Sequence, residues 1–400
     1  MLPFSEALAR LLAGAPPLGA ERVSLDEAWG RVLAEDVIAP APLPPFDYSA
    51  MDGYALRRAD LAGDGPWDLP VVGESAAGGE LPALVTGAAC RIFTGARLPE
   101  GADTVLMQEN VERRGDRLAV SALSQPGAHI RRRGDDLVEG AIALARGLRM
   151  TPGRIALAAS QERAQLFVAR RPVVTVLCSG DELRAPGEAG RPGSVVESNG
   201  YFVAAAARSA GAIVRVAPFV RDDEETSKLA VRDALRGSDL VVTIGGVSVG
   251  DRDVIKPALE AAGVTLDFWK VKIKPGKPLA VGHLGATQVL GLPGNPASAS
   301  LTFLLFGMPL IRALQGDASP LPMRLRAAAA TSFRRNPGRE EFVRARLESS
   351  AEGLRVHFFR NQASGSVVSF AEAEALAVIA EDRAQVSEGE LIEVIRIGDI

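Results

Sequence analysis

The spacing of hydrophobic residues near the start of the chain predicts two helices. Hydrophobic positions between residues 4 and 12 recur along one face of a helix. A second helical stretch is expected around residues 24–31, where Ser24 and Glu27 have the spacing of a capping box. The proline-rich stretch 40–45 then ends regular structure.

The next part of the chain has the pattern of a small β domain. From residue 71 to residue 120, short hydrophobic runs alternate with Gly and Pro turns, and no long amphipathic helix is expected. A helix is predicted again over residues 151–160, with Pro152 in its first turn.

After residue 170 the pattern changes to strands that alternate with helices. The predicted strands are 173–177, 213–220, 240–244, 264–273 and 288–292, and the predicted helices are 199–209, 224–235, 253–262 and 297–314. Such alternation predicts a central, mainly parallel sheet with helices on both faces. After Pro320, strands and turns indicate a C-terminal β barrel or sandwich.

These patterns predict a multidomain α/β protein. Its expected parts are an N-terminal region (1–48 and 134–170), an inserted β domain (49–133), an α/β domain (171–318) and a C-terminal β-barrel domain (319–400).

Composition narrows the possible functions. The formal net charge of -4 argues against a nucleic-acid partner. The chain begins without a cationic start, and its longest apolar run, residues 301–311, is short for a membrane span, so we expect a cytoplasmic protein without membrane contact. Two distant cysteines and three scattered histidines support neither a disulfide framework nor a zinc site. We therefore expect any metal to be a hard cation held by oxygens.

Lysine is rare and clustered. Only six of the 45 basic residues are lysines, and five of these lie between residues 256 and 277. An arginine-rich codon bias that happens to spare one strand is the alternative explanation. The functional interpretation is that this stretch needs compact ammonium charges beside its Pro-Gly turn, which a planar guanidinium does not replace.

The unusual loops of the α/β domain all follow its predicted strands. They are CSGDEL, VRDDEE, GGVSVGDRD, KIKPGKP and LPGNPAS. Parallel strands bind ligands beyond their carboxyl ends, so we expect these loops to meet at one edge of the sheet. In each case a plain tight turn or a solvated loop is the alternative.

Three of these loops suggest an anion site with a metal beside it. Gly245, Gly246 and Gly250 permit close backbone approach to an anion, and Ser248 supplies a donor. Carboxylates in the same and neighbouring loops would repel that anion unless a divalent cation lies between them, which predicts Mg²⁺. These carboxylates are Asp181, Glu182, Asp222, Asp223, Asp251 and Asp253.

Further candidate segments lie outside this domain. Asp52 stands in the proline-bounded loop FDYSAMDGYA, and Thr94 lies between hydrophobic strands. The segment 129–136 carries three arginines and two aspartates, a charge run that by itself is typical of a solvated face.

Taken together, the segments resemble the molybdopterin molybdotransferase (MoeA) family, which includes the C-terminal domain of gephyrin. The resemblance covers nearly the whole chain in one order: SAMDGYA, TGARLPEGAD, IRRRGDD, SGDEL, ESN, GGVSVGDRD, KPGKP and LPGNP. Cys178, where the family often has serine, and Glu197, where it often has aspartate, are mild departures.

The resemblance implies an elongated homodimer in which residues of the inserted domain complete the partner's cleft. By match to the family motifs, the implied catalytic residues are Asp52, Thr94, Arg131, Asp136, Glu182, Asp222, Asp253, Lys270 and Lys274. The implied metal ligands are Glu182, Asp222 and Asp253. The implied substrate-binding residues are Ser179, Gly180, Gly245, Gly246, Ser248, Gly250, Lys277, Pro293, Gly294, Asn295, Pro296, Ser298, Arg339 and Ser366.

The implied reaction takes molybdate and adenylylated molybdopterin as small-molecule substrates, with Mg²⁺ as cofactor, and releases AMP. Transient contact with other molybdenum-cofactor enzymes is also implied. Two alternatives stay open: a molybdopterin adenylyltransferase, which shares the α/β domain, and a gephyrin-like scaffold. The choice between molybdate and tungstate also stays open, because the two oxyanions have the same charge and nearly the same shape.

Overall fold

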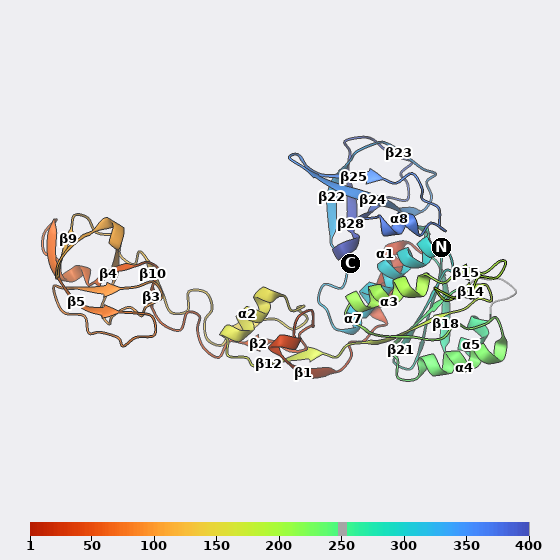
Figure 1. Cartoon of the computed structure of the whole chain (residues 1–400), viewed down its shortest axis with the longest axis horizontal. Helices are drawn as coiled ribbons and strands as arrows, with labels where there is room; N and C mark the ends of the chain where they lie inside the picture. Colours follow the sequence, from red (N-terminus) through yellow and green to blue (C-terminus); the bar gives the residue numbers. More distant parts are fainter. Residues whose placement is uncertain (247–253, 400) are drawn as a thin grey trace. The chain divides into compact units, whose positions relative to one another are not determined.

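The computed structural model describes residues 1–246 and 254–399, which form two compact units (Figure 1). The first unit comprises residues 1–35, 146–155 and 165–400, and the second comprises residues 36–145 and 156–164. These limits differ from the expected domain limits after residues 48 and 133. One reason is that β2 (Val37–Ile38) pairs with β11 (Ile142–Leu144) inside the second unit.

The second unit is built on a six-stranded sheet with hydrophobic residues buried on both faces. Its strand order is β7 (Thr104–Met107), β4 (Gly53–Leu56), β6 (Ala89–Ile92), β5 (Trp67–Ser75), β9 (Arg117–Val120) and β8 (Glu112–Arg114). Along β4, Tyr54 and Leu56 pack in one core and Ala55 packs in another. This alternation is what a strand covered on both faces requires, and the predicted inserted β domain is confirmed. The short strands β3 (Tyr48–Ser49) and β10 (Ile130–Arg131) pair beside it.

The N-terminal segment of the first unit contains one of the two predicted helices. Helix α1 (Phe4–Ala13) forms as expected. The helix expected around residues 24–31 is wrong: the chain forms β1 (Ala20–Ser24), which pairs with β12 (Gln165–Ala169), followed by a single 3₁₀ turn over 25–27. The Ser24 hydroxyl donates to the Glu27 carboxylate at 3.3 Å and caps no backbone N–H. Strand pairing therefore overrides the local helical signal. Helix α2 (Pro152–Ser160) confirms the prediction for residues 151–160.

The α/β domain contains a six-stranded sheet. Its order is β16 (Ile213–Val216), β13 (Val173–Cys178), β17 (Leu240–Ile244), β21 (Thr287–Leu292), β20 (Pro278–Leu284) and β18 (Thr265–Lys270). The first four strands are parallel, as predicted. Strand β20 is missing from the prediction. It forms an antiparallel hairpin with β21 and pairs antiparallel with β18.

Helices cover both faces of this sheet, as predicted (Figure 1). One face packs against α1, α3 (Asn199–Ser209) and the helix formed by α6 (Pro296–Thr302), a π-helical turn (Phe303–Gly307) and α7 (Met308–Leu314). The other face packs against α4 (Glu224–Leu235) and α5 (Ile255–Ala261).

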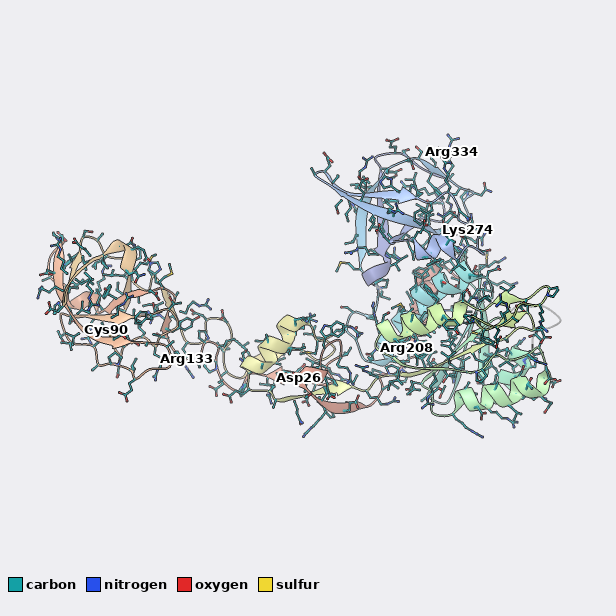
Figure 2. The ribbon with its side chains drawn as sticks, in the orientation of Figure 1. Asp26, Cys90, Arg133, Arg208, Lys274 and Arg334 are labelled. Carbon is teal, nitrogen blue, oxygen red and sulfur yellow. The ribbon has the colours of Figure 1, made fainter. Side chains whose placement is uncertain are left out.

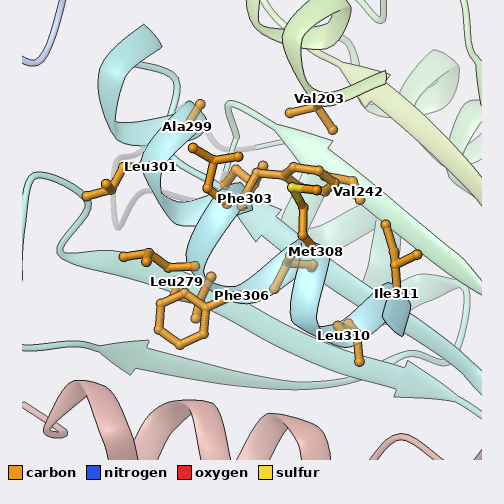
Figure 3. Packing of buried hydrophobic residues seen from close by; sticks show 14 of the residues in the cluster. Val203, Val242, Leu279, Ala299, Leu301, Phe303, Phe306, Met308, Leu310 and Ile311 are labelled. Atoms are coloured by element: carbon orange, nitrogen blue, oxygen red, sulfur yellow. The ribbon is translucent and has the colours of Figure 1, made fainter. Parts of the chain in front are cut away.

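The helix over residues 296–314 is the centre of the largest core. Figure 3 shows its side chains packed beside Val242 of the sheet and Val203 of α3. Among the described residues it is the one helix long and apolar enough to cross a membrane, and 89% of its most hydrophobic window is buried inside the protein. The apolar run counted from the sequence as residues 301–311 is therefore part of a longer, buried helix.

The C-terminal domain is a closed barrel. Strands β24 (Glu340–Ser350), β25 (Gly353–Phe358), β22 (Arg324–Ala329), β28 (Leu391–Arg396) and β26 (Ala375–Ile379) pair in a ring that closes from β26 back to β24. Two short strands, β23 (Phe333–Arg334) and β27 (Gln385–Val386), pair beside it. The predicted barrel is confirmed. The barrel also shares a core with the α/β domain, because the Phe4 ring packs edge-on against both Phe306 and Phe342. The centroid of the Phe4 ring lies 5.3 Å from that of Phe306 and 5.2 Å from that of Phe342.

Candidate active site

The candidate loops of the α/β domain lie at one edge of its sheet. Strands β13, β16, β17 and β21 are parallel, so their carboxyl ends share that edge. Strand β18 has the same direction, because β20 is antiparallel to both β18 and β21. The turn KIKPGKP therefore follows β18 on the same side of the sheet as the acidic loops.

The loops after β13 and β16 are joined by backbone contacts. The Gly180 N–H donates to the Val220 carbonyl at 3.1 Å, and the Asp222 N–H donates to the Asp181 carboxylate at 3.3 Å. Gly180 has a φ of +150°, and a Cβ there would lie 2.6 Å from the Glu182 carboxylate. The positive φ favours glycine, and a larger residue would also displace the Glu182 carboxylate. The structure thus brings Glu182 and Asp222 to adjacent loops.

The glycines after β17 cross close to the same loop. A Cβ on Gly245 would lie 2.9 Å from the Ser179 carbonyl oxygen, and one on Gly246 would lie 2.7 Å from Ile255. Both glycines have positive φ. Gly245 therefore permits close approach to the Ser179 backbone, and Gly246 permits close packing of Ile255. The approach to an anion that the sequence predicts at these glycines stays a prediction. Ser248, Gly250, Asp251 and Asp253 lie outside the described residues.

The donor chemistry of the acidic loops suits a hard cation. Among the residues that the structure describes, no group of three or more His, Cys, Asp or Glu side chains is placed to hold a metal. Magnesium, however, is commonly held by one or two carboxylates, with water and phosphate oxygens completing its shell. Glu182 and Asp222, both exposed at the strand ends, fit that requirement.

A pocket of about 350 Å³ lies where the barrel meets the α/β domain. Lys274, which Figure 2 labels, is one of its lining residues. It is lined by residues from the lysine turn, the LPGNP loop, the first turn of α6 and the barrel. These are Lys274, Pro275, Gly276, Lys277, Pro278, Pro293, Asn295, Ser298, Arg339, Glu341, Phe342, Gln362 and Ser364. The structure therefore gathers Lys274, Lys277, Pro293, Asn295, Ser298 and Arg339 from the sequence-based prediction.

The LPGNP loop lies between the pocket and the acidic loops. Pro293 and Asn295 line the pocket. Gly294 approaches Gly245, to which a Cβ on Gly294 would come within 3.8 Å, and the Gly294 carbonyl accepts a hydrogen bond from the Asn199 side chain at 2.8 Å. One loop thus contributes to both clusters.

A buried ion-pair network forms the wall of the pocket on the barrel side. The Lys274 ammonium lies 2.9 Å from Oε1 of Glu341, and Nε of Arg335 lies 3.4 Å from Oε2. The side chains of Glu341 and Arg335 are 4% and 2% exposed. The sequence analysis missed both residues. For Glu341 the available signal was a charged residue at the start of a largely hydrophobic strand, whereas Arg335 lies outside the strands.

A second missed arginine, Arg344, supports another part of the pocket lining. Arg344 is 1% exposed, and its guanidinium donates to the Gln362 side chain at 3.1 Å and to the Ala363 carbonyl at 3.2 Å. Burial lowers the pKa of Arg344. The segment that it holds includes Ser364, whose carbonyl accepts the Ala297 N–H at the start of α6 at 2.8 Å.

The lysine cluster is divided among different neighbours. Lys274 and Lys277 line the pocket, whereas Lys272 pairs with Glu381 of the barrel at 2.8 Å. Lys270 ends β18, where its carbonyl accepts the Leu2 N–H, and its exposed side chain is not among those that line the pocket. The interpretation that clustered lysines supply charge to a ligand therefore applies most directly to Lys274 and Lys277.

Ser366 and Pro296 line a different, smaller pocket of about 120 Å³. The Ser366 hydroxyl accepts the Ser369 N–H at 3.4 Å at the start of α8 (Val368–Ala371) and a hydrogen bond from the Asn361 side chain at 3.3 Å. Its neighbour Ser364 lies in the main pocket.

In the second unit, the four predicted residues form two exposed pairs. The Asp52 carboxylate accepts the Thr94 N–H and hydroxyl, each at 2.8 Å, and the hydrogen bond from the N–H is the largest cause that lowers the pKa of Asp52. The Arg131 guanidinium forms an ion pair with Oδ1 of Asp136 at 2.5 Å. The carboxylate of Asp47 was not predicted from the sequence. Its Oδ2 forms an ion pair with the Arg132 guanidinium at 2.6 Å.

The fold and the candidate site together define a multidomain α/β protein whose candidate ligand site lies at the carboxyl edge of a largely parallel sheet and is bordered by a β barrel. Three family models match the chain: the MoeA N-terminal region (domains I and II) over residues 2–161, a probable molybdopterin-binding domain over residues 175–313, and the MoeA C-terminal region (domain IV) over residues 326–397.

Curated relatives agree with these models. The chain is 37% identical to the molybdopterin molybdenumtransferase of Haemophilus influenzae over 98% of both chains, and 37% identical to molybdopterin molybdenumtransferase 2 of Mycobacterium tuberculosis over 93% of this chain and 94% of that one. The molybdopterin biosynthesis moeA protein of Pyrococcus horikoshii superposes with a TM-score of 0.86 at 29% identity, covering 99% of this chain and all of that one. The chain belongs to the molybdopterin molybdenumtransferase (MoeA) family, and the predicted family and fold class are confirmed.

Proposed function

We propose that this protein is a molybdopterin molybdenumtransferase of molybdenum cofactor biosynthesis, which inserts molybdate into adenylylated molybdopterin and releases AMP. The observation that carries this proposal is the cation-lined pocket beside the acidic loops at one sheet edge. Full-length similarity to relatives that carry this name supports it.

Molybdate is a small dianion, and the pocket supplies donors suited to it. Lys277 and Arg339 contribute positive charge, and Ser298, which is 5% exposed, contributes a hydroxyl. Lys274 adds a third cation, whose position Glu341 fixes. Charge-assisted hydrogen bonds from such groups are stronger than neutral ones.

The acidic loops suit the phosphate end of the adenylylated pterin. We assign Glu182 and Asp222, with Asp253 from the sequence, as ligands of Mg²⁺. The bound cation would neutralise negative charge on the pyrophosphate.

The reaction joins the two clusters. A water oxygen forms a bond to phosphorus of the pyrophosphate link, the bridging P–O bond breaks, and AMP leaves. The two dithiolene thiols then give up their protons as their sulfurs form bonds to molybdenum, and one oxo group of molybdate takes up these two protons and leaves as water. The LPGNP loop, which touches both clusters, orients the two substrates relative to each other.

We further propose that the protein is a cytoplasmic homodimer in which Asp52, Thr94, Arg131 and Asp136 complete the partner's site. Their pairing in exposed loops supports a role in contact with another molecule. The pKa of Asp52, held below its usual range by Thr94, keeps that carboxylate ionised at neutral pH.

The test is AMP release from adenylylated molybdopterin with Mg²⁺ and molybdate. We expect the wild type to release AMP, and Lys277→Ala to lose at least about tenfold in turnover because a charged donor to the oxyanion is removed. Lys228→Ala is the matched control, since Lys228 pairs with Glu224 and Glu225 on α4, and it should keep full activity.

Two results would contradict the proposal. Pyrophosphate release from ATP and molybdopterin, without AMP release from the adenylylated substrate, would identify an adenylyltransferase. Absence of molybdate-dependent turnover together with capture of a receptor tail would identify a scaffold.

A further inference from the structure

We propose that Glu341 is a positioning residue that holds Lys274 in the pocket and takes up part of its charge, so that molybdate is bound weakly enough to be passed on. This inference rests on the proposed function, because it needs an oxyanion in the pocket. It concerns a residue of the barrel that no sequence motif indicated.

The positions of Glu341 and Lys274 are fixed by the backbone. The short strand β19 (Ile273–Lys274) pairs in parallel with the start of β24, and Lys274 stands opposite Glu341 in the register. The two side chains therefore meet across a strand pair rather than by chance contact of two long, flexible groups. Their charged atoms lie 2.9 Å apart.

Arg335 forms an ion pair with the carboxylate on its other side. Its guanidinium donates to the carbonyls of Ile379 at 3.1 Å, Glu381 at 3.4 Å, Asn336 at 3.2 Å and Arg339, and its Nε lies 3.4 Å from Oε2 of Glu341. Because Arg335 is 2% exposed and donates to four carbonyls, its guanidinium is fixed in place beside Glu341. Lys274, whose side chain is 45% exposed, is the partner of Glu341 that can also reach the pocket.

The sign of the charge of Glu341 sets its effect on the ligand. Among the described residues that line the pocket, Glu341 is the one carboxylate, beside Lys274, Lys277 and Arg339. A buried negative charge repels a dianion strongly, because the low dielectric of the interior screens little. Lys274 shared between Glu341 and the ligand therefore gives a weaker ground-state complex than a lysine without this partner would give.

The test is molybdate binding by isothermal titration calorimetry with full-length protein. Glu341→Gln keeps the size of the side chain and removes its charge, so we expect molybdate to bind about tenfold more tightly, with a lower KM for molybdate and a lower kcat. A purely structural role would give weaker binding instead. Glu381→Gln is the matched control: its partner Lys272 lies on the same seam but outside the pocket, and its affinity should equal that of the wild type.

A second pair of variants isolates the repulsion. Lys274→Met leaves the Glu341 carboxylate facing the pocket without its lysine, and we expect molybdate affinity to fall by about 100-fold. Adding Glu341→Gln to that variant should recover at least about tenfold of the loss. Equal affinity of Lys274→Met and the double variant would overturn the inference.

A measurement on the wild type covers the case in which Glu341→Gln does not fold, since that change leaves Arg335 buried without its carboxylate. Acetylation by acetic anhydride, read by peptide mass spectrometry, should be several-fold slower at Lys274 than at Lys277, because the Lys274 ammonium is held by Glu341. Equal rates would overturn the inference. If the wild type binds no molybdate, both the proposed function and this inference fail. If the wild type binds molybdate and Glu341→Gln binds it equally or more weakly, this inference alone is overturned.

Discussion

At the scale of single residues, Asp239 shows how one carboxylate holds the start of the α/β sheet. It accepts two hydrogen bonds from Arg170, at 2.6 and 2.7 Å, and one from the Val173 N–H at 2.8 Å. Burial raises the pKa of Asp239, but the hydrogen bonds from Arg170 and Val173 outweigh burial, so the pKa lies below its usual range. The carboxylate therefore stabilises the fold in its ionised form.

A pH-dependent loss of stability follows. A lowered pKa in the folded state gives stability that is present above the pKa of the unfolded chain and lost as the pH falls through the folded value. Asp239→Asn should lower the free energy of unfolding by about 1.5–3 kcal/mol at pH 7, and the difference from the wild type should shrink below about pH 4. Urea denaturation of the wild type and Asp239→Asn, followed by circular dichroism from pH 7 to below about pH 4, measures this difference in the free energy of unfolding.

The matched control is Asp233→Asn. Asp233 forms an exposed pair with Arg236 on α4 at 3.1 Å, and its loss should change the free energy of unfolding by less than about 0.5 kcal/mol. A difference between wild type and Asp239→Asn that stays constant down to pH 3 would refute the role given to the ionised carboxylate.

At the scale of elements, the turn between β19 and β20 depends on Gly276. This glycine has a φ of +102°, and a Cβ on it would lie 2.5 Å from Oγ1 of Thr302. Thr302 is fully buried in α6, so it cannot move aside. The turn that presents Lys274 and Lys277 is thereby pressed against the helix that presents Ser298.

Substitution at this glycine should therefore affect binding as well as stability. Gly276→Ala should cost about 2–3 kcal/mol of stability and weaken molybdate binding, because the turn must shift away from α6. Gly285→Ala is the control: its φ is +57°, but nothing lies within 4 Å of the added Cβ. It should cost about 1 kcal/mol from backbone strain alone and leave binding unchanged. Thermal unfolding and calorimetric titration of both variants distinguish steric from conformational effects, and equal molybdate affinity in the two would contradict the steric explanation.

At the scale of the whole molecule, the predicted site residues are divided between the two compact units. Asp52, Thr94, Arg131 and Asp136 belong to the second unit, and the lysine pocket belongs to the first. The proposed homodimer accounts for this division if each site takes residues from both protomers.

Complementation between two inactive variants tests the shared site. Asp52→Ala and Lys277→Ala should each be nearly inactive alone. Coexpressed and purified as a mixture, they should recover about a quarter of wild-type activity, since half of the dimers are then mixed and each mixed dimer has one intact site of two. Light scattering should give the mass of a dimer. A monomer, or a mixture no more active than its components, would exclude sites shared between protomers.

The sequence by itself determined most elements of the α/β domain, although not strand β20. Residues 199–209, 224–235 and 240–244 form the predicted helices and strand with the predicted limits, because the two helices have helical hydrophobic spacing and the strand is a short apolar run. Parallel strands then bring the loops after them to one edge, so the sequence alone predicts a common site for the acidic and lysine-bearing loops.

Only the tertiary structure decided which charges face one another. Local spacing reports which face of an element is buried, but it does not report which residue lies across from it. The pairing of β19 with β24 brings Glu341 to Lys274, and the pairing of β1 with β12 replaces the helix predicted near Ser24. Such pairings join segments distant in the sequence, and their energies depend on the whole fold rather than on the local pattern.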